Sequence, residues 1–293
     1  MTHTSDIFDM NAAPIRIGTV TLRVRDLDAV SSFYQRVLGL TSIADSDKNI
    51  TLAANGTPLI RLYGDPALSP RDPRQAGLFH TAFLMPSRAD LGRWLSYVRS
   101  ADIQLQGASD HIVSEALYLS DPEGNGIEVY ADRPVSSWRD QDGNIQMATE
   151  RLDVEDLLQV AAQTDWAGFP EGGSIGHVHL QVGDTAVANR FYRDVLGFDV
   201  TVDYPGATFY GSGGYHHQLA GNVWNSRGAT VRTSGMAGIE EVEILARDIS
   251  IVTSLIGRAE GMAIDHTNEM SGVKLLDPWG TAIRIREREA ATL

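Results

Sequence analysis

The chain has 293 residues and a formal net charge of −14, with 43% hydrophobic and 21% charged residues. This length and composition favour two globular parts of ordinary size, each with its own core. The acidic balance argues against binding to nucleic acid or to anionic membrane surfaces, since phosphate groups require clustered Lys and Arg. No apolar stretch of about 18 residues is present, which argues against a membrane-spanning helix.

The chain contains no cysteine. Any metal must therefore be held by His, Asp or Glu side chains. The first residues, MTHTSDIFDMNAAP, lack the basic start and the apolar centre of a signal peptide. By default, we expect a cytoplasmic location.

Two distant segments share one pattern, GTVTLRVRDLDAVSSFYQRVLGL at 18–40 and GHVHLQVGDTAVANRFYRDVLGF at 176–198. Each predicts a strand, a short turn with an aspartate, and an amphipathic helix. Gly39 and Gly197 are expected to end the helices, because glycine readily adopts the left-handed conformation found there. The chain therefore contains an internal repeat.

Residues 78–130 and 239–287 follow the same plan more loosely, and each ends in a hairpin around an Asp-Pro turn. The chain thus reads as four repeated βαβββ units of roughly 50–60 residues. Such units predict an α+β fold with two domains of cupped mixed sheets.

The expected domain boundaries follow from these units. The first domain takes residues 1–140, a linker takes 141–172, and the second domain takes 173–293. The linker is polar and contains a predicted helix at Val154–Gln163.

The most informative stretch is SDHIVSEALYLSDPEGNGIEVYADRP at 109–134. Its central cluster of turn-forming residues predicts a β-hairpin, with Tyr118 before the turn and Glu128 after it. Glu128 alternates with Ile127 and Val129, so it faces water or has a buried partner that offsets its desolvation.

His80 lies on the first strand of the second unit, Glu128 on its last strand, and His177 on the first strand of the third unit. Two imidazoles and one carboxylate form a facial triad that suits non-haem Fe(II), and Mn(II) accepts the same ligands. A single strand histidine is more often structural, and an isolated glutamate is often an edge charge. Their joint occurrence at equivalent positions of a repeat favours a metal site.

The first and fourth units carry Thr19, Glu241 and Arg284 at the equivalent positions. These residue types do not form the triad. We therefore expect the first and fourth units to form a half without metal.

These residues resemble the vicinal-oxygen-chelate superfamily, which has a glyoxalase/bleomycin-resistance-like fold, and within it the extradiol ring-cleaving dioxygenases of the catechol 2,3-dioxygenase group. The resemblance is most specific in three segments: DHIVSEALYLSDPEGNGIEVYADRP, GHVHLQV with FYRDVLGFDV, and GGYHHQLAGNVW at 213–224. It implies that His80, Glu128 and His177 bind iron, with O2 as co-substrate. Because this set spans the second and third units, we expect those two units to pair.

The resemblance also implies roles around the metal. His217 corresponds to an acid–base histidine, and His111 and Tyr118 correspond to residues that hydrogen-bond the substrate. Three further residues are candidates for the layer behind the ligands, namely His179, His216 and Gln218, and at position 218 many relatives carry a third histidine. The implied partner is a small aromatic diol, and a homo-oligomer is common among such enzymes.

A pocket for a planar ring needs apolar walls. Candidates, which could equally be core residues, are Phe79, Phe83, Tyr210, Tyr215 and Trp224. Two alternatives remain open: a glyoxalase-type isomerase or thiol transferase that uses Zn, Ni or Mn, and a non-catalytic protein that binds an aromatic ligand. Such isomerases commonly use a second glutamate as a fourth ligand, and none stands on the matching strand of the third unit.

Overall fold

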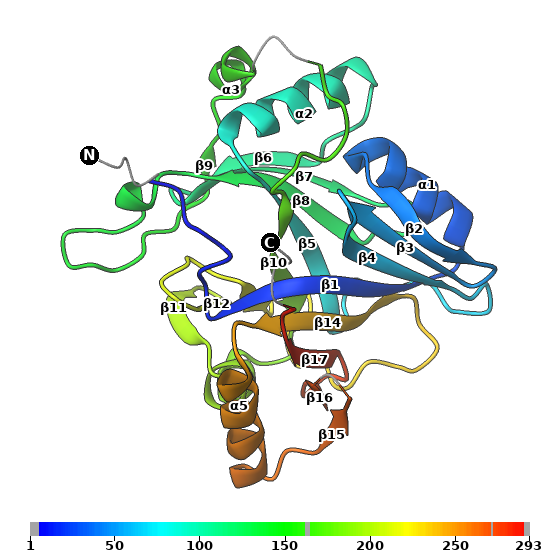
Figure 1. The fold of residues 1–293 in the computed structure, drawn as a ribbon, viewed down its shortest axis with the longest axis vertical. Coiled ribbons are helices and arrows are strands. Elements are labelled where there is room, and N and C mark those ends of the chain that lie inside the picture. The colour runs from blue at the N-terminus through cyan, green and yellow to red at the C-terminus, as the bar shows by residue number, and fades with distance from the viewer. Residues whose placement is uncertain (1–5, 162–164, 271, 290–293) are drawn as a thin grey trace.

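The computed structural model describes residues 6–161, 165–270 and 272–289, which form two mixed β-sheets flanked by helices (Figure 1). The eight-stranded sheet has the spatial order β15 (His266–Glu269), β16 (Gly272–Leu276), β17 (Ala282–Glu287), β14 (Gly238–Ala246), β1 (Ile15–Val24), β4 (Thr57–Gly64), β3 (Asn49–Ala54) and β2 (Thr41–Ser46). The nine-stranded sheet has the order β11 (Asp199–Tyr204), β12 (Ala207–Gly211), β13 (Leu219–Asn222), β10 (Ser174–Gln181), β5 (Gly77–Met85), β8 (Gly126–Asp132), β7 (Ser114–Ser120), β6 (Gly107–Asp110) and β9 (Glu150–Arg151). The expected α+β fold of mixed sheets is confirmed.

The first strands of two different units pair antiparallel at the centre of each sheet. β1 pairs with β14 in one sheet, and β5 pairs with β10 in the other; Figure 1 shows the blue β1 beside the orange β14. The second unit thus pairs with the third, as the metal triad requires. The division into residues 1–140, 141–172 and 173–293 stays a prediction, and both sheets combine strands from either side of that linker.

The described helices are α1 (Leu27–Leu38), α2 (Arg88–Ser100), α3 (Val154–Val160), α4 (Thr185–Asn189) and α5 (Ile249–Gly261), with a 3-10 turn at Val135–Ser137. Asp26 accepts a hydrogen bond from the Ala29 N–H at the start of α1, and Gly39 ends α1 with a φ of 67°. In the second copy of the repeat, α4 widens into a π-helical turn at Arg190–Val195. α3 begins where its sequence predicts, and residues 162–164 lie outside the described residues.

Glycine at position 176 allows the backbone of β10 to lie close to the Tyr130 side chain. Gly176 precedes His177 where the register between β10 and β5 is irregular. A Cβ at this position would lie 1.8 Å from the hydroxyl oxygen of Tyr130 on β8. Any larger residue would push β10 away from the Tyr130 side chain. In the described part of the chain, no helix has the length and apolarity needed to cross a bilayer.

Candidate active site

The three predicted metal ligands converge in the nine-stranded sheet. Glu128 Oε2 lies 2.9 Å from His80 Nε2 and 3.3 Å from His177 Nε2, and the two Nε2 atoms are 3.3 Å apart. All three residues are buried. Three ligands at right angles around an ion with bonds of about 2.1 Å lie about 3 Å from one another. The donor set and its spacing therefore fit one divalent cation.

The protonation states also suit a metal. Burial raises the pKa of the Glu128 carboxyl, but His177 and His80 outweigh burial and hold this pKa well below its usual range. Burial lowers the pKa of His177 to about 4, against the opposing effect of Glu128. At neutral pH the site thus offers a carboxylate and a neutral imidazole, the forms that bind metals.

A cavity of about 290 Å³ opens over the triad. Apart from the three ligands, it is lined by Phe79, Ser109, His111, Tyr118, Met147, Ala148, Thr149, His179, Tyr204, Phe209, His217 and Trp224. Phe79 and Trp224 line it as expected. Its walls are thus mainly aromatic, with the polar groups gathered at the triad.

Three of the candidate wall residues do not line this cavity. Phe83 packs in the core against Tyr34 and Phe169. Tyr210 turns its hydroxyl to Asn189, to which it donates a hydrogen bond of 2.6 Å, and Tyr215 is fully buried. Aromatic residues are as often core as wall, and the sequence does not separate the two.

His111 and Tyr118 form a hydrogen-bonded pair beside the triad. The carbonyl of Ala148 lies 2.6 Å from His111 Nδ1, so this nitrogen carries a proton. In a neutral ring, Nε2 then accepts from the Tyr118 hydroxyl, 2.6 Å away. Burial and the neighbouring Glu128 raise the pKa of Tyr118 well above its usual value, so it remains a phenol.

The turn after His111 is strained. Ile112 has a φ of 71°, which is unusual for a β-branched residue, and its N–H donates to Asp110. Strain at such a turn is typical of positions that orient functional side chains.

Met147, Ala148 and Thr149 line the cavity and belong to the expected linker. Sequence reasoning missed them, because backbone and apolar contacts leave no motif.

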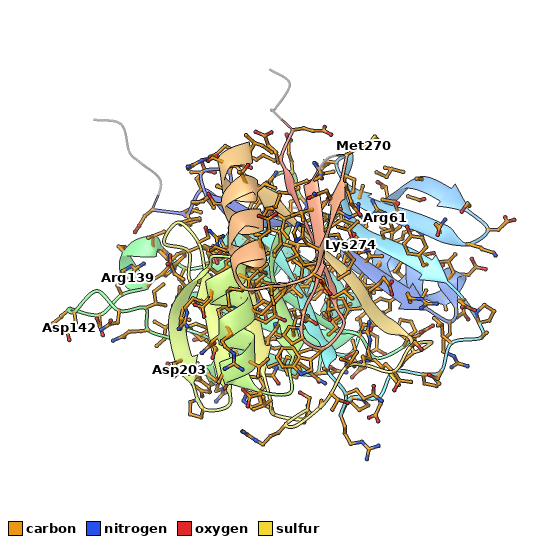
Figure 2. All side chains as sticks on the ribbon, turned by 90° about the horizontal axis from the view of Figure 1, so that it is seen from below. Arg61, Arg139, Asp142, Asp203, Met270 and Lys274 are labelled. Carbon is orange, nitrogen blue, oxygen red and sulfur yellow. The ribbon has the colours of Figure 1, made fainter. Side chains whose placement is uncertain are left out.

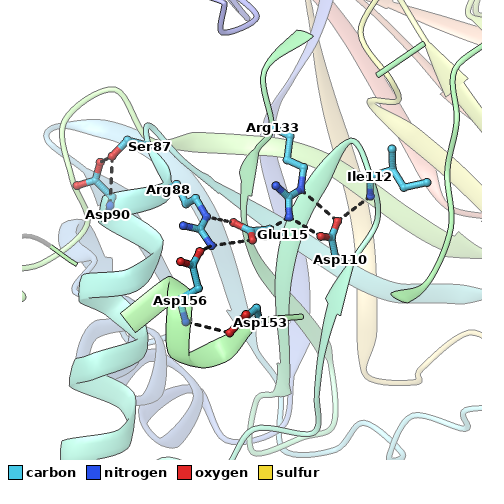
Figure 3. A network of polar contacts seen from close by, with 9 residues as sticks. All are labelled: Ser87, Arg88, Asp90, Asp110, Ile112, Glu115, Arg133, Asp153 and Asp156. Carbon is cyan, nitrogen blue, oxygen red and sulfur yellow. Dashed lines mark hydrogen bonds and ion pairs between the residues drawn. The ribbon is translucent and has the colours of Figure 1, made fainter. Parts of the chain in front are cut away.

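A network of ion pairs links the β6–β7 hairpin to the helices α2 and α3 (Figure 3). The buried Glu115 on β7 pairs with Arg88 from α2 and with Arg133, which follows β8. Arg133 also pairs with Asp110, and Arg88 with Asp156 on α3. The network ties both helices to β7, which carries Tyr118, and through Asp110 to the end of β6 next to His111.

His217 and His179 flank the triad. The His217 ring lies 4.1 Å from that of His177, and the His179 ring lies 5.0 Å from that of His80. Burial, followed by neighbouring histidines, lowers the pKa of both rings well below its usual value. Both are therefore neutral at pH 7. Gln218 lies apart from the cavity, and its amide donates to the Ile15 and Ser212 carbonyls.

His216 Nδ1 is hydrogen-bonded to His217 Nδ1, and His216 Nε2 is hydrogen-bonded to Asp132 Oδ1. Sequence reasoning missed Asp132, although it alternates with Glu128 and Tyr130 along β8 and so shares their face. That period of two is the signal that could have identified it.

The eight-stranded sheet holds an ion cluster at the equivalent place. Glu241 pairs with Arg284 at 2.8 Å and with Lys274 at 3.1 Å, and the Thr19 N–H donates to Glu243. Arginine and lysine thus occupy the space around Glu241. Among the described residues, His80, Glu128 and His177 are the group whose ligand atoms could share a metal ion.

The chain matches the family model described as "Glyoxalase/Bleomycin resistance protein/Dioxygenase superfamily" over residues 16–129 and 174–241. It is 37% identical to catechol-2,3-dioxygenase of Bacillus subtilis (strain 168) over 266 residues, 88% of this chain and 93% of the relative. It is 30% identical to biphenyl-2,3-diol 1,2-dioxygenase 3 of Rhodococcus globerulus, over 40% of this chain and 63% of that protein. The structure of a putative dioxygenase from Bacillus subtilis superposes with a TM-score of 0.61 at 12% identity, covering 94% of this chain and 86% of that one, which shows the shared fold.

Proposed function

The chain belongs to the glyoxalase/bleomycin resistance protein/dioxygenase superfamily, and we propose that it is an extradiol dioxygenase that opens the ring of a catechol-type diol with O2. The observation that carries this proposal is the convergence of His80, Glu128 and His177 at the base of an aromatic-walled cavity. A facial triad leaves positions for both a diol and O2.

His80, Glu128 and His177 would hold Fe(II), and Mn(II) is compatible with the same donor set. When bound, such a metal would act as a Lewis acid that favours deprotonation of a diol hydroxyl, and it would supply the binding site for O2. Because the triad supplies one negative charge, a divalent ion keeps a net positive charge that favours a diol anion. Phe79, Phe209 and Trp224 then provide apolar surfaces for the ring.

Tyr118 and His111 are assigned to the substrate side. Tyr118 stays protonated and donates to His111 Nε2, so its oxygen can accept a hydrogen bond from a diol hydroxyl near Glu128. His111 is held in one orientation by the Ala148 carbonyl, and its Nε2 can accept a proton passed through Tyr118. Together the pair orients the diol and receives a proton from it.

His217 is assigned the acid–base role on the oxygen side. It lines the cavity and lies against His177, and burial keeps its ring neutral near pH 7. A neutral imidazole with a free nitrogen can take a proton and return it later in the cycle. With this assignment, His80, Glu128 and His177 need not take part in proton transfer.

The test is O2 uptake after anaerobic loading with Fe(II), measured on a panel of substituted catechols. We expect one O2 consumed per diol, with a yellow ring-opened product, and loss of both metal and turnover in His80→Ala. His266→Ala, a histidine on β15 of the other sheet, should behave like the unmodified protein. Full iron loading without O2 uptake on any catechol would refute the proposal and favour an isomerase or a binding protein.

A further inference from the structure

A row of three hydrogen-bonded side chains runs inward from the cavity. His217 lines the cavity, whereas His216 and Asp132 do not. His217 Nδ1 lies 2.8 Å from His216 Nδ1, and His216 Nε2 lies 2.9 Å from Asp132 Oδ1. The His216 side chain is fully buried and that of Asp132 is 4% exposed, so water does not compete for these contacts.

The carboxylate at one end determines the direction of every hydrogen bond in the row. A carboxylate oxygen can only accept a hydrogen bond, so His216 Nε2 carries the proton shared with Asp132. A neutral His216 then has a lone pair on Nδ1, and His217 Nδ1 must donate to it. The proton of neutral His217 is thus placed on Nδ1, and its Nε2 is left with a free lone pair.

The surroundings hold this row in place. Asp132 Oδ1 also accepts a hydrogen bond from the Tyr215 hydroxyl at 3.1 Å, so two donors hold this oxygen in one position. The indole of Trp138 packs on the His216 ring at 4.9 Å, and Phe8 packs on both Trp138 and Tyr215. In this dry setting, hydrogen bonds are strong and directional.

We propose that Asp132 is a positioning residue that acts through His216 to keep the Nε2 lone pair of His217 available to the cavity. The arrangement follows the logic of the aspartate that orients the histidine of a Ser-His-Asp triad, with a second imidazole inserted between them. The inference rests on the role of His217 in the proposed function.

The first experiment replaces the carboxylate while keeping its shape. In Asp132→Asn, we expect kcat to fall about 100-fold or more, because the amide can donate to His216 and reverse the row. The KM for the diol should stay within about threefold, and the Fe(II) content should not change. Asp142→Asn is the matched control, since Asp142 lies on an exposed outer loop (Figure 2).

A double-mutant cycle separates positioning from a structural effect. In a His217→Asn background, Asp132→Asn should lower kcat by no more than about twofold further, because the group it acts through is already absent. An equal loss from Asp132→Asn in both backgrounds would overturn the inference.

The tautomer of His217 gives a readout that does not depend on turnover. Nitrogen-15 NMR of the histidine rings in the metal-free protein should place the His217 proton on Nδ1 and the His216 proton on Nε2. A proton on His217 Nε2 would overturn the inference even in an active enzyme. If the expected tautomers appear but no catechol is cleaved, the proposed function fails while the positioning by Asp132 stands.

Discussion

Glu128 shows at the scale of one residue how burial can coexist with ionisation. Its carboxylate is 3% exposed, yet two imidazole nitrogens lie within 3.3 Å of it. A buried carboxylate without partners would become neutral instead. The sequence position alone left this choice open, and the convergence of three strands decided it.

Glu128→Gln should weaken metal binding by at least about 100-fold, because an amide oxygen lacks the charge that offsets the cation. Titration calorimetry with a divalent ion, supported by metal analysis, measures the change. Glu150→Gln, an exposed residue on β9 of the same sheet, is the control. Unchanged affinity in Glu128→Gln would mean that the carboxylate is not a ligand.

Trp224 lies at the cavity wall with 46% of its surface exposed, in an edge contact with Phe79 and a tilted contact with His179. Trp224→Ala should raise the KM for an aromatic diol about fivefold, since aromatic contacts of this kind contribute about 1 kcal/mol. Steady-state kinetics at saturating O2 test this. A drop in kcat at constant KM would instead assign the indole to the reaction step.

At the scale of elements, the hairpin of β7 and β8 carries both Glu128 of the proposed metal site and Tyr118, which is assigned to the substrate side. Tyr118 and Glu128 are direct cross-strand neighbours, so one strand pairing determines their spacing. The hairpin is predictable from its turn residues. Its anchoring is not, because Arg88 reaches Glu115 from α2 and is itself paired with Asp156 on α3, which is distant in sequence.

Glu115→Ala should lower the free energy of unfolding by about 2–3 kcal/mol, because it leaves Arg88 and Arg133 without their buried partner. The estimate is reduced for the partial exposure of both arginines. Urea unfolding measures the change, with Glu155→Ala on the exposed face of α3 as the control. A loss no greater than in that control would show that the network does not stabilise the hairpin.

At the scale of the whole molecule, stability should depend on pH through the buried histidines. The pKa of His177 is about 4 in the folded protein and 6.5 when unfolded, so the unfolded state binds more protons between these values. The stability of the metal-free protein should therefore be full above pH 6.5 and fall as pH approaches 4. The loss from His177 alone is about 2 kcal/mol at pH 5.

Urea unfolding of the metal-free protein at pH 7, 6 and 5 tests this dependence. His177→Asn should flatten the profile relative to His266→Asn, because His177 is buried and its pKa is lowered to about 4, whereas His266 is partly exposed. The lowered pKa values of His179 and His217 act in the same direction. Stability that is constant from pH 7 to 5 would contradict the burial of neutral imidazoles.

The sequence by itself determined the repeated units, the turns and glycines that bound them, and the residue types of the triad. These features are local, because strand alternation, helix periodicity and turn chemistry act over a few residues. From the equivalent positions of the repeat, the first and fourth units could also be expected to lack the triad, since they carry Thr19, Glu241 and Arg284 there.

Only the tertiary structure decided which groups surround the triad. The Ala148 carbonyl orients His111, and Asp132 supports His217 through His216, across sequence separations of 37 and more than 80 residues. Phe209 became a wall of the cavity, whereas Phe83 became core. Such choices depend on how the two sheets and the segment after β8 pack together, which no short pattern in the chain encodes.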